Sequence, residues 1–213
     1  GDLTLWENLT GGQTIDLLMK LHGNGDETKK QELVKKFNLD LSKKVKSYSK
    51  GNRQKVGLIA ALAVDCDLYI LDEPTSGLDP LMESIFQDEI ARLKKQQKAV
   101  LLSSHILSEV ERLADRVVII QEGSVVESGT LEELRHLTRS TIHLKVTNEV
   151  TPLSILHFIH DWSQIDQNQA TFSIDHQSMD NLLQVLTEYQ IQKLEILPPT
   201  LEELFMRHYQ VQK

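Results

Sequence analysis

The sequence is poor in the features that mark several protein classes. Its 213 residues include one cysteine, Cys66, so no internal disulfide can form, which suits a reducing compartment. No apolar run approaches the roughly 18 residues that a membrane-spanning helix needs, and no signal peptide is visible. We therefore expect any role at a membrane to depend on a partner.

Basic residues are in the minority. Lysine and arginine number 23 against 31 aspartates and glutamates, which gives a formal net charge of -8 and a pI of about 5.5. Because nucleic-acid-binding proteins carry a basic footprint, this balance argues against broad nucleic-acid binding, although it leaves room for a local phosphate site. The apolar share of 40% is enough to bury a core.

The first 60 residues show helical patterns. A capping box at Thr4 and Glu7 predicts the start of a helix, and Gly11 and Gly12 predict an interruption within it. Apolar residues at helical spacing then continue to about residue 23, and residues 27–37 predict a further helix. A basic stretch leads into another helix from about residue 54.

Short apolar runs then alternate with helical segments. The runs at 68–71, 99–102 and 117–120 are typical of buried parallel strands, and Pro80 fits the first turn of a helix. This alternation predicts an α/β domain with a parallel sheet.

The character of the chain changes near residue 138. Strands are expected at 141–146, 170–174 and 191–196, helices at 152–160 and 179–189, and a last helix capped by Thr200 and Glu203. Residues 138–213 are therefore predicted to form a small α+β domain.

A pair of carboxylates stands directly after the first apolar run. Asp72 and Glu73 would lie at the carboxyl end of a strand, where open α/β sheets bind ligands. Two acids there are costly unless a cation or a catalytic task uses them. One carboxylate can hold Mg²⁺ while the other faces an attacking water, and the alternative is a turn with solvated acids.

Two further features stand at the ends of predicted elements. Ser49 occupies the N-cap position of a helix, where free N–H groups and the helix dipole attract phosphate. His105 follows the apolar run at 99–102 and could reach a phosphate oxygen. The alternatives are an ordinary capped helix and a structural or merely exposed histidine.

Four short segments now stand in a specific order. They are Tyr48-Ser49-Lys50-Gly51-Asn52, the strand from Leu68 to Asp72 with Glu73, the turn Ser76-Gly77-Leu78-Asp79, and His105. In order and spacing they resemble the signature, Walker B, D-loop and switch histidine of the nucleotide-binding subunits of ABC transporters. The resemblance implies a partial P-loop NTPase domain over residues 1–137, with a helical subdomain at 1–60 and the Walker B part at 61–137.

The resemblance implies roles for the residues at the strand ends. Asp72 would orient Mg²⁺, Glu73 would polarise the attacking water as general base, and His105 would contact the γ-phosphate of ATP.

The signature segment would serve a second ATP molecule, held by an opposing subunit. Ser49 and the amides of Gly51 and Asn52 would bind its γ-phosphate, with Lys50 adding positive charge. Asp79 would help couple the two ATP sites. The tail, with its segment from Pro199 to Phe205, resembles the C-terminal extension of drug- and peptide-export members that pair with ABC-2-type permeases.

The partners implied are a second nucleotide-binding subunit and a transmembrane permease, without nucleic acid. The chain would then lie in the cytoplasm, peripheral to the membrane. Two alternatives stay open: an ABC ATPase without a transport task, and a binding module that has lost catalysis. The acidic charge and the export-like tail weigh against the first.

The sequence departs from the family pattern in two ways. In the usual Leu-Ser-Gly-Gly-Gln signature, Lys50 here replaces the first glycine and Asn52 the glutamine. The 213 residues also contain no GxxxxGK[ST] P-loop, which supplies most of the grip on ATP. We therefore expect a truncated chain that exposes apolar sheet surface, binds ATP poorly and lacks appreciable ATPase activity alone. Thr10-Gly11-Gly12-Gln13 imitates a signature but is interpreted as the helix interruption.

Overall fold

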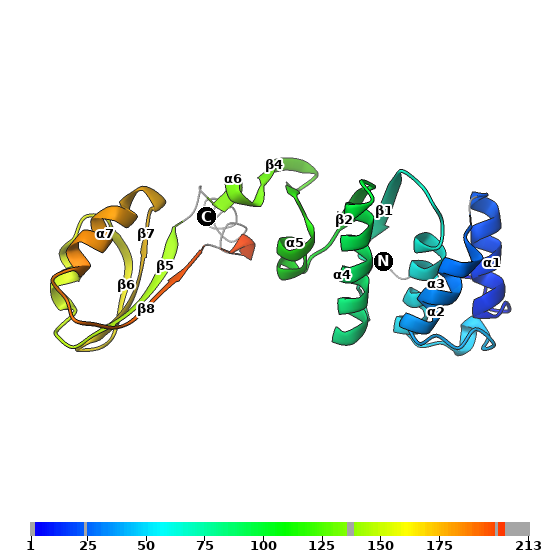
Figure 1. The fold of residues 1–213 in the computed structure, drawn as a ribbon, viewed down its shortest axis with the longest axis horizontal. Helices are drawn as coiled ribbons and strands as arrows, with labels where there is room; N and C mark the ends of the chain where they lie inside the picture. Colours follow the sequence, from blue (N-terminus) through cyan, green and yellow to red (C-terminus); the bar gives the residue numbers. More distant parts are fainter. Residues whose placement is uncertain (1–2, 24, 136–138, 199, 203–213) are drawn as a thin grey trace. The chain divides into compact units, whose positions relative to one another are not determined.

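The computed structural model describes residues 3–23, 25–135, 139–198 and 200–202 (Figure 1). The chain divides into two compact units, Gly1–Glu109 and Val110–Lys213. The functional boundary expected near residue 137 stays a prediction. In the described ranges, no helix is both long and apolar enough to cross a membrane.

Three helices open the first unit. They are α1 (Gly11–His22), α2 (Glu27–Lys36) and α3 (Lys50–Leu62), with a 3₁₀ turn, η1 (Val45–Ser47), before α3. Both α1 and α2 contact α3. Each helix contributes a fully buried aliphatic side chain, Ile15, Leu33 and Ile59 respectively, so the three helices form one small core.

The first helix begins at Gly11, and the start predicted at Thr4 is wrong. Thr10 is the N-cap: its hydroxyl accepts from the Gln13 N–H at 3.2 Å, and Gln13 Oε1 accepts from the Thr10 N–H at 2.9 Å. The segment predicted to interrupt a helix is therefore its capping box. The stretch before it is not helical, because the Glu7 and Leu9 carbonyls accept from the amides of residues 46 and 45.

A two-stranded parallel sheet and α4 follow. The sheet pairs β1 (Leu68–Asp72) with β2 (Ala99–Ser103), and α4 (Pro80–Lys95) connects them and contacts β2; α5 (Leu107–Leu113) follows. On one face of β1, Tyr69 and Leu71 are buried. On the other, Leu68, Ile70 and Leu101 are 51%, 69% and 61% exposed. The strands are therefore not buried on both faces as expected, whereas the expected exposure of apolar sheet surface is confirmed.

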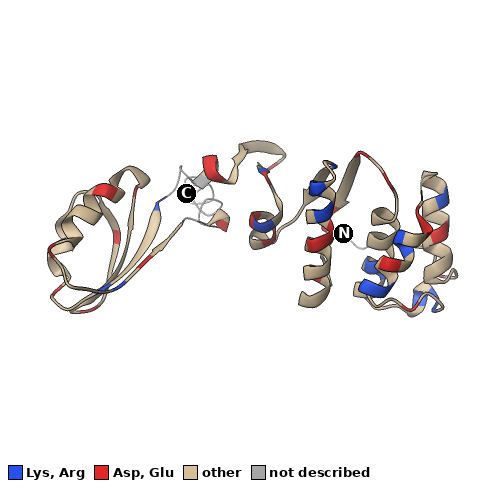
Figure 2. Cartoon of the chain, in the orientation of Figure 1, with Lys and Arg blue, Asp and Glu red and all other residues tan. Residues whose placement is uncertain are grey.

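An ion-pair network joins α2 to α4. Glu89 of α4, only 2% exposed, contacts Lys36 of α2 at 2.7 Å and Arg92 at 2.8 Å, and Lys36 also contacts Glu32 at 2.6 Å. Figure 2 shows acidic and basic residues together on these helices. The buried carboxylate is thus compensated by cations, as a buried charge requires, and the network ties the helical part of the unit to α4.

After the last residues of α5, the second unit continues with a hairpin. It pairs β3 (Arg116–Gln121) with β4 (Ser124–Thr130) in antiparallel fashion, and the short helix α6 (Leu131–Arg135) follows. The apolar run at 117–120 is thus a strand, but its partner in the described residues is antiparallel.

An antiparallel four-stranded sheet completes the second unit, with strand order β6-β7-β5-β8. Its elements are β5 (Ser140–Val146), η2 (Thr151–Ile155), β6 (Ile159–Asp166), β7 (Gln169–Ile174), η3 (His176–Ser178), α7 (Met179–Leu186) and β8 (Ile191–Leu197). Leu182 and Leu186 of α7 pack against Ile142 and Phe172 of the sheet. This matches the predicted small α+β domain.

One predicted element of this sheet is wrong. Residues 152–160 were expected to form a helix, but they form a single 3₁₀ turn and the start of β6. The pairing of β6 with β7 contains two register shifts, which break the alternation that marks a strand. The last helix, predicted from Thr200 and Glu203, extends into residues outside those described.

Candidate functional site

The two parallel strands end side by side at polar residues. Asp72 and Ser103 are register partners and therefore point to the same face of the sheet. The Ser103 hydroxyl donates to Asp72 Oδ1 at 2.5 Å. This bond orients an exposed carboxylate at the carboxyl end of β1, where the acid pair was predicted.

Glu73 turns away from the line of the strand. Its φ of 45° lies in the left-handed region, which is uncommon for a residue with a side chain and costs energy unless its surroundings hold it. The Glu73 N–H lies 3.2 Å from the Ser103 carbonyl and 3.1 Å from its hydroxyl. Ser103 thus holds both acids of the pair.

The structure brings His105 to Glu73. His105 Nδ1 lies 2.6 Å from Glu73 Oε2, across the ends of β1 and β2. The histidine side chain is 72% exposed and the glutamate side chain 25% exposed. A carboxylate oriented by an accessible imidazole is an arrangement suited to general base chemistry.

The signature segment lies where the helix α3 begins. Ser49 is the N-cap, and its hydroxyl accepts from the Asn52 N–H at 3.3 Å. The first turn of α3 carries no acidic residue, so the helix dipole remains available to an anion. A pocket of about 360 Å³ opens here, lined by Ser49, Lys50, Gly51, Asn52, Lys55, Gly77, Leu78 and Asp79.

The signature and the D-loop are in direct contact. A Cβ placed on Gly51 would lie 2.5 Å from the Gly77 carbonyl oxygen, so only glycine fits at residue 51. Gly77 has a φ of 80°, which also favours glycine. Asp79 is the N-cap of α4 and accepts from the Met82 N–H at 3.0 Å. The predicted signature and D-loop residues therefore share one pocket.

Three residues of this region escaped sequence reasoning: Ser103, Gln54 and Glu109. The Gln54 Nε2 group donates to the carbonyls of Glu73 and Pro74 at 3.2 and 2.9 Å. The position of Ser103 at the end of a predicted strand, two residues before His105, was a usable signal. The contacts of Gln54 with Glu73 and Pro74 and of Glu109 with Thr75 gave none, because these partners lie far away along the chain.

Glu109 is a buried carboxylate between two loops. It is 5% exposed, and its Oε2 accepts from the hydroxyls of Thr75 at 3.2 Å and Ser104 at 2.7 Å. Its Oε1 is buried without a hydrogen-bond partner among the described residues. Through Glu109, the segment after Glu73 is tied to the segment that carries His105.

The acid pair fits Mg²⁺ bound together with a phosphate compound. Within the described part of the chain, no three or more histidine, cysteine or acidic side chains gather as a complete metal site. Mg²⁺, however, is usually held by one or two carboxylates, waters and phosphate oxygens. The exposed carboxylate of Asp72, oriented by Ser103, provides such a ligand.

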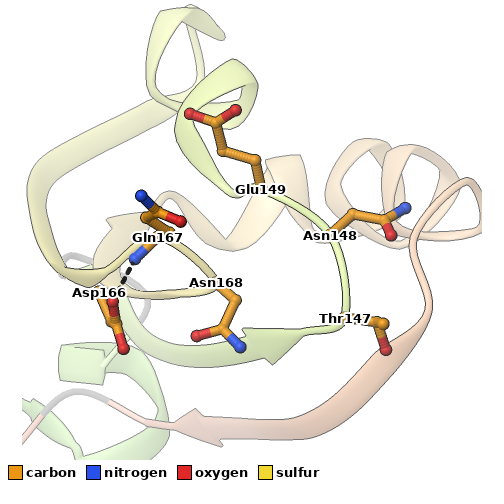
Figure 3. A pocket seen from close by; sticks show the side chains of 6 residues that line it. All are labelled: Thr147, Asn148, Glu149, Asp166, Gln167 and Asn168. Atoms are coloured by element: carbon orange, nitrogen blue, oxygen red, sulfur yellow. Dashed lines mark hydrogen bonds between the residues drawn. The ribbon is translucent and has the colours of Figure 1, made fainter.

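Another pocket, of about 370 Å³, lies in the second unit (Figure 3). It is lined by Thr147, Asn148, Glu149, Asp166, Gln167 and Asn168, from the turn that follows β5 and from the end of β6 and the turn after it. The Gln167 N–H donates to Asp166 Oδ1 at 2.7 Å. Neither carboxylate is buried, so nothing there forces a bound cation, and we assign no site to it.

Two family models match the chain. One, described as "ATP-binding protein DrrA1-3-like, C-terminal domain", matches residues 129–209. The other, described as an AAA domain, matches residues 27–111. The matches together span most of both units.

Among curated proteins, the chain is 39% identical over 145 residues to the ABC transporter ATP-binding protein NatA of Bacillus subtilis, a match that covers 66% of this chain and 59% of that protein. It is 29% identical over 172 residues to the bacitracin transport ATP-binding protein BcrA of Enterococcus faecalis, covering 79% of this chain and 56% of that protein. The chain thus spans little more than half the length of these relatives.

Among solved structures, the ATP-binding subunit of an ABC transporter is 34% identical with a TM-score of 0.58, and the match covers 63% of this chain and 58% of that one. The dimeric ATP-binding cassette MJ0796, bound to ADP and Pi, has a TM-score of 0.55 at 21% identity and shows a likeness of fold; 61% of this chain and 60% of that one are covered. In the order of its motifs, in its fold and in these sequence matches, the chain is similar to ABC transporter ATP-binding proteins.

Proposed function

We propose that this chain carries the hydrolytic and signature elements of an ABC exporter's ATP-binding subunit. The subunit would couple ATP hydrolysis to export through a transmembrane permease of the ABC-2 type. The observation that supports hydrolysis is the 2.6 Å contact between Glu73 and His105, next to Asp72 at the carboxyl end of β1. Export is supported by the DrrA-like tail and by the similarity to a bacitracin transport protein.

Each residue of the acid pair has a task in this proposal. Glu73 acts as general base, since its carboxylate, oriented by His105, can polarise a water for attack on the γ-phosphate. His105 is exposed enough to contact the γ-phosphate itself. Mg²⁺, when held by Asp72, would neutralise negative charge on the phosphate oxygens.

The signature pocket serves the ATP molecule of an opposing subunit. Ser49 and the amides of Gly51 and Asn52 present donors at the start of α3, and Lys50 lines the same pocket. Asp79 lines the same pocket and would help couple the two ATP sites. The pairing of two subunits is supported by the dimeric cassette with the same fold.

The test is ATP turnover by the full-length product of the reading frame that contains these residues, purified with its membrane partner. Replacing Glu73 with Gln removes the base and is expected to lower kcat by about 10²- to 10⁴-fold while ATP binding persists. Glu188→Gln, an exposed position after α7, is the matched control and should leave kcat unchanged.

Two outcomes would contradict the proposal. One is a Glu73→Gln variant that turns over ATP at the rate of the unchanged protein. The other would be ATP turnover by the 213 residues alone. These residues contain no P-loop and should show no appreciable turnover. Activity of this isolated chain that disappears on Glu73→Gln would show that the P-loop is not needed.

A further inference from the structure

The side chain of Gln54 joins two segments that the proposed function gives to different ATP molecules. Gln54 lies within the first two turns of α3, the helix that Ser49 caps. Its amide group donates to the Glu73 carbonyl at 3.2 Å and to the Pro74 carbonyl at 2.9 Å. An amide has two N–H donors, and here both are directed to the backbone beyond β1.

This backbone is the part of the site that most needs support. Glu73 adopts a φ of 45°, a conformation that persists only where several contacts fix it. Ser103 binds its N–H, His105 binds its carboxylate, and Gln54 binds its carbonyl. Gln54 is the one of these three that belongs to the signature helix.

A second contact links the same two segments. Gly51, in the first turn of α3, packs so closely on the Gly77 carbonyl that no side chain would fit between them. The loop from Glu73 to Asp79 is therefore attached to α3 at both of its ends. A shift of α3 along its axis must move the loop with it.

We propose that Gln54 is a positioning residue that transmits the position of the α3 N-terminus to the general base Glu73. Binding of a nucleoside triphosphate of the opposing subunit at Ser49 would then set the geometry of hydrolysis at Glu73. This inference rests on the proposed function and adds to Asp79 a second route between the two ATP sites. The route relies on the helix moving as a rigid element, and misplacement of a catalytic group by about 1 Å can cost about 100-fold in rate.

Three substitutions separate hydrogen bonding from packing. Gln54→Leu keeps similar bulk but removes both donors, and Gln54→Glu keeps the shape but places an acceptor against two carbonyls. Gln54→Lys retains a donor on a chain long enough to reach them. In the full-length protein with its membrane partner, we expect kcat to fall about tenfold in the first two and to recover partly in the third, with KM changed less than about twofold. Gln87→Leu, at a half-buried position on α4, is the matched control.

Hydrogen–deuterium exchange gives a readout that requires no turnover. Amides of residues 73–78 should exchange about tenfold faster in Gln54→Leu than in the unchanged protein or in Gln87→Leu, because the loop has lost an anchor. Unchanged exchange and unchanged kcat in both Gln54→Leu and Gln54→Glu would overturn the inference. So would a rise in KM that accounts for the whole loss of kcat/KM, since that result indicates impaired binding.

The controls distinguish failure of this inference from failure of the proposed function. If Glu73→Gln turns over ATP normally, the proposed function is wrong and the coupling has no meaning. If Glu73→Gln is inactive while Gln54→Leu keeps normal kcat and normal exchange, hydrolysis stands and the coupling through Gln54 is wrong.

Discussion

The parallel sheet of β1 and β2 and the antiparallel sheet of β5 to β8 differ in how far their apolar side chains are buried. In the sheet of β5 to β8, Ile142, Leu144 and Phe172 are at most 1% exposed and are packed with Leu182 and Leu186 of α7. In the sheet of β1 and β2, the apolar side chains on one face are more than half exposed. The sheet of β5 to β8 buries its own core, whereas the sheet of β1 and β2 leaves an apolar face open beside Asp72.

This difference indicates that the sheet with the complete core and the sheet with the candidate catalytic residues are not the same. Each buried aliphatic or aromatic side chain contributes roughly 1.5–3 kcal/mol when it leaves water, and an exposed one contributes little. The C-terminal sheet therefore has a complete core of its own. The candidate catalytic residues instead lie at the end of the β1–β2 sheet, which is buried on one face only. They are held by polar contacts such as those of Ser103 and Gln54.

The largest effect is expected from equal truncations in the two sheets. Phe172→Ala removes a side chain that is 1% exposed and stacks on Trp162 at 5.5 Å, so it should destabilise the C-terminal sheet by about 3–5 kcal/mol. Ile70→Ala removes a side chain that is 69% exposed and should change stability by less than about 0.5 kcal/mol. Chemical denaturation followed by circular dichroism and hydrogen exchange measures both.

Comparable losses in the two variants would break the comparison. They would mean that Ile70 is covered in solution and that the sheet of β1 and β2 has a core of its own as well. Val185→Ala, a partly buried position at the edge of the C-terminal core, should give an intermediate loss and calibrates the scale.

A smaller effect is expected at the buried carboxylate of the first unit. Glu109→Ala leaves the hydroxyls of Thr75 and Ser104 without their acceptor and should cost about 1–3 kcal/mol, measured by denaturation of the first unit. Glu109→Gln should cost less, because an amide oxygen can still accept from both. If the alanine and glutamine variants were equally destabilised, the charge of Glu109 rather than its two hydrogen bonds would be the stabilising feature.

Local chemistry made part of the site predictable. Asp72 and Glu73 stand out because two acids end an apolar strand, and the parallel register of β1 and β2 then brings His105 beside them. Ser49 was identified as a cap because capping depends on a few neighbouring residues. What these residues do with ATP stays a prediction.

Long-range pairing decided the elements that sequence reasoning missed. The capping box at Thr4 failed because the following backbone bonds to residues 45 and 46, while an equivalent box at Thr10 succeeded. The segment 152–160 has helical spacing, yet pairing with β7 draws its end into a strand. The contacts of Gln54 with Glu73 and of Glu109 with Thr75 could not be recognised, since the partners are 19 and 34 positions apart along the chain.

The smallest effect is electrostatic, at the surface of the C-terminal unit. Asp175 Oδ1 accepts from Arg139 Nε at 3.0 Å, and His160 Nε2 lies 3.4 Å from Oδ2. The hydrogen bond from Arg139 holds the pKa of Asp175 below its usual value of 3.8. A folded-state pKa below the unfolded one means that the unfolded chain binds more protons in acid.

The stability that this pair contributes is therefore fully present above about pH 4 and is lost as the pH falls through the folded-state pKa. Since Asp175 is 55% exposed, the contribution should stay below about 1 kcal/mol. Arg139→Gln should lower stability slightly at neutral pH, and the difference from the unchanged protein should shrink below pH 4, as measured by urea denaturation across this range. A difference that persists unchanged in acid would show that Arg139 acts by packing, because apolar burial does not titrate. The C-terminal core would then carry even this edge of the unit without help from charge.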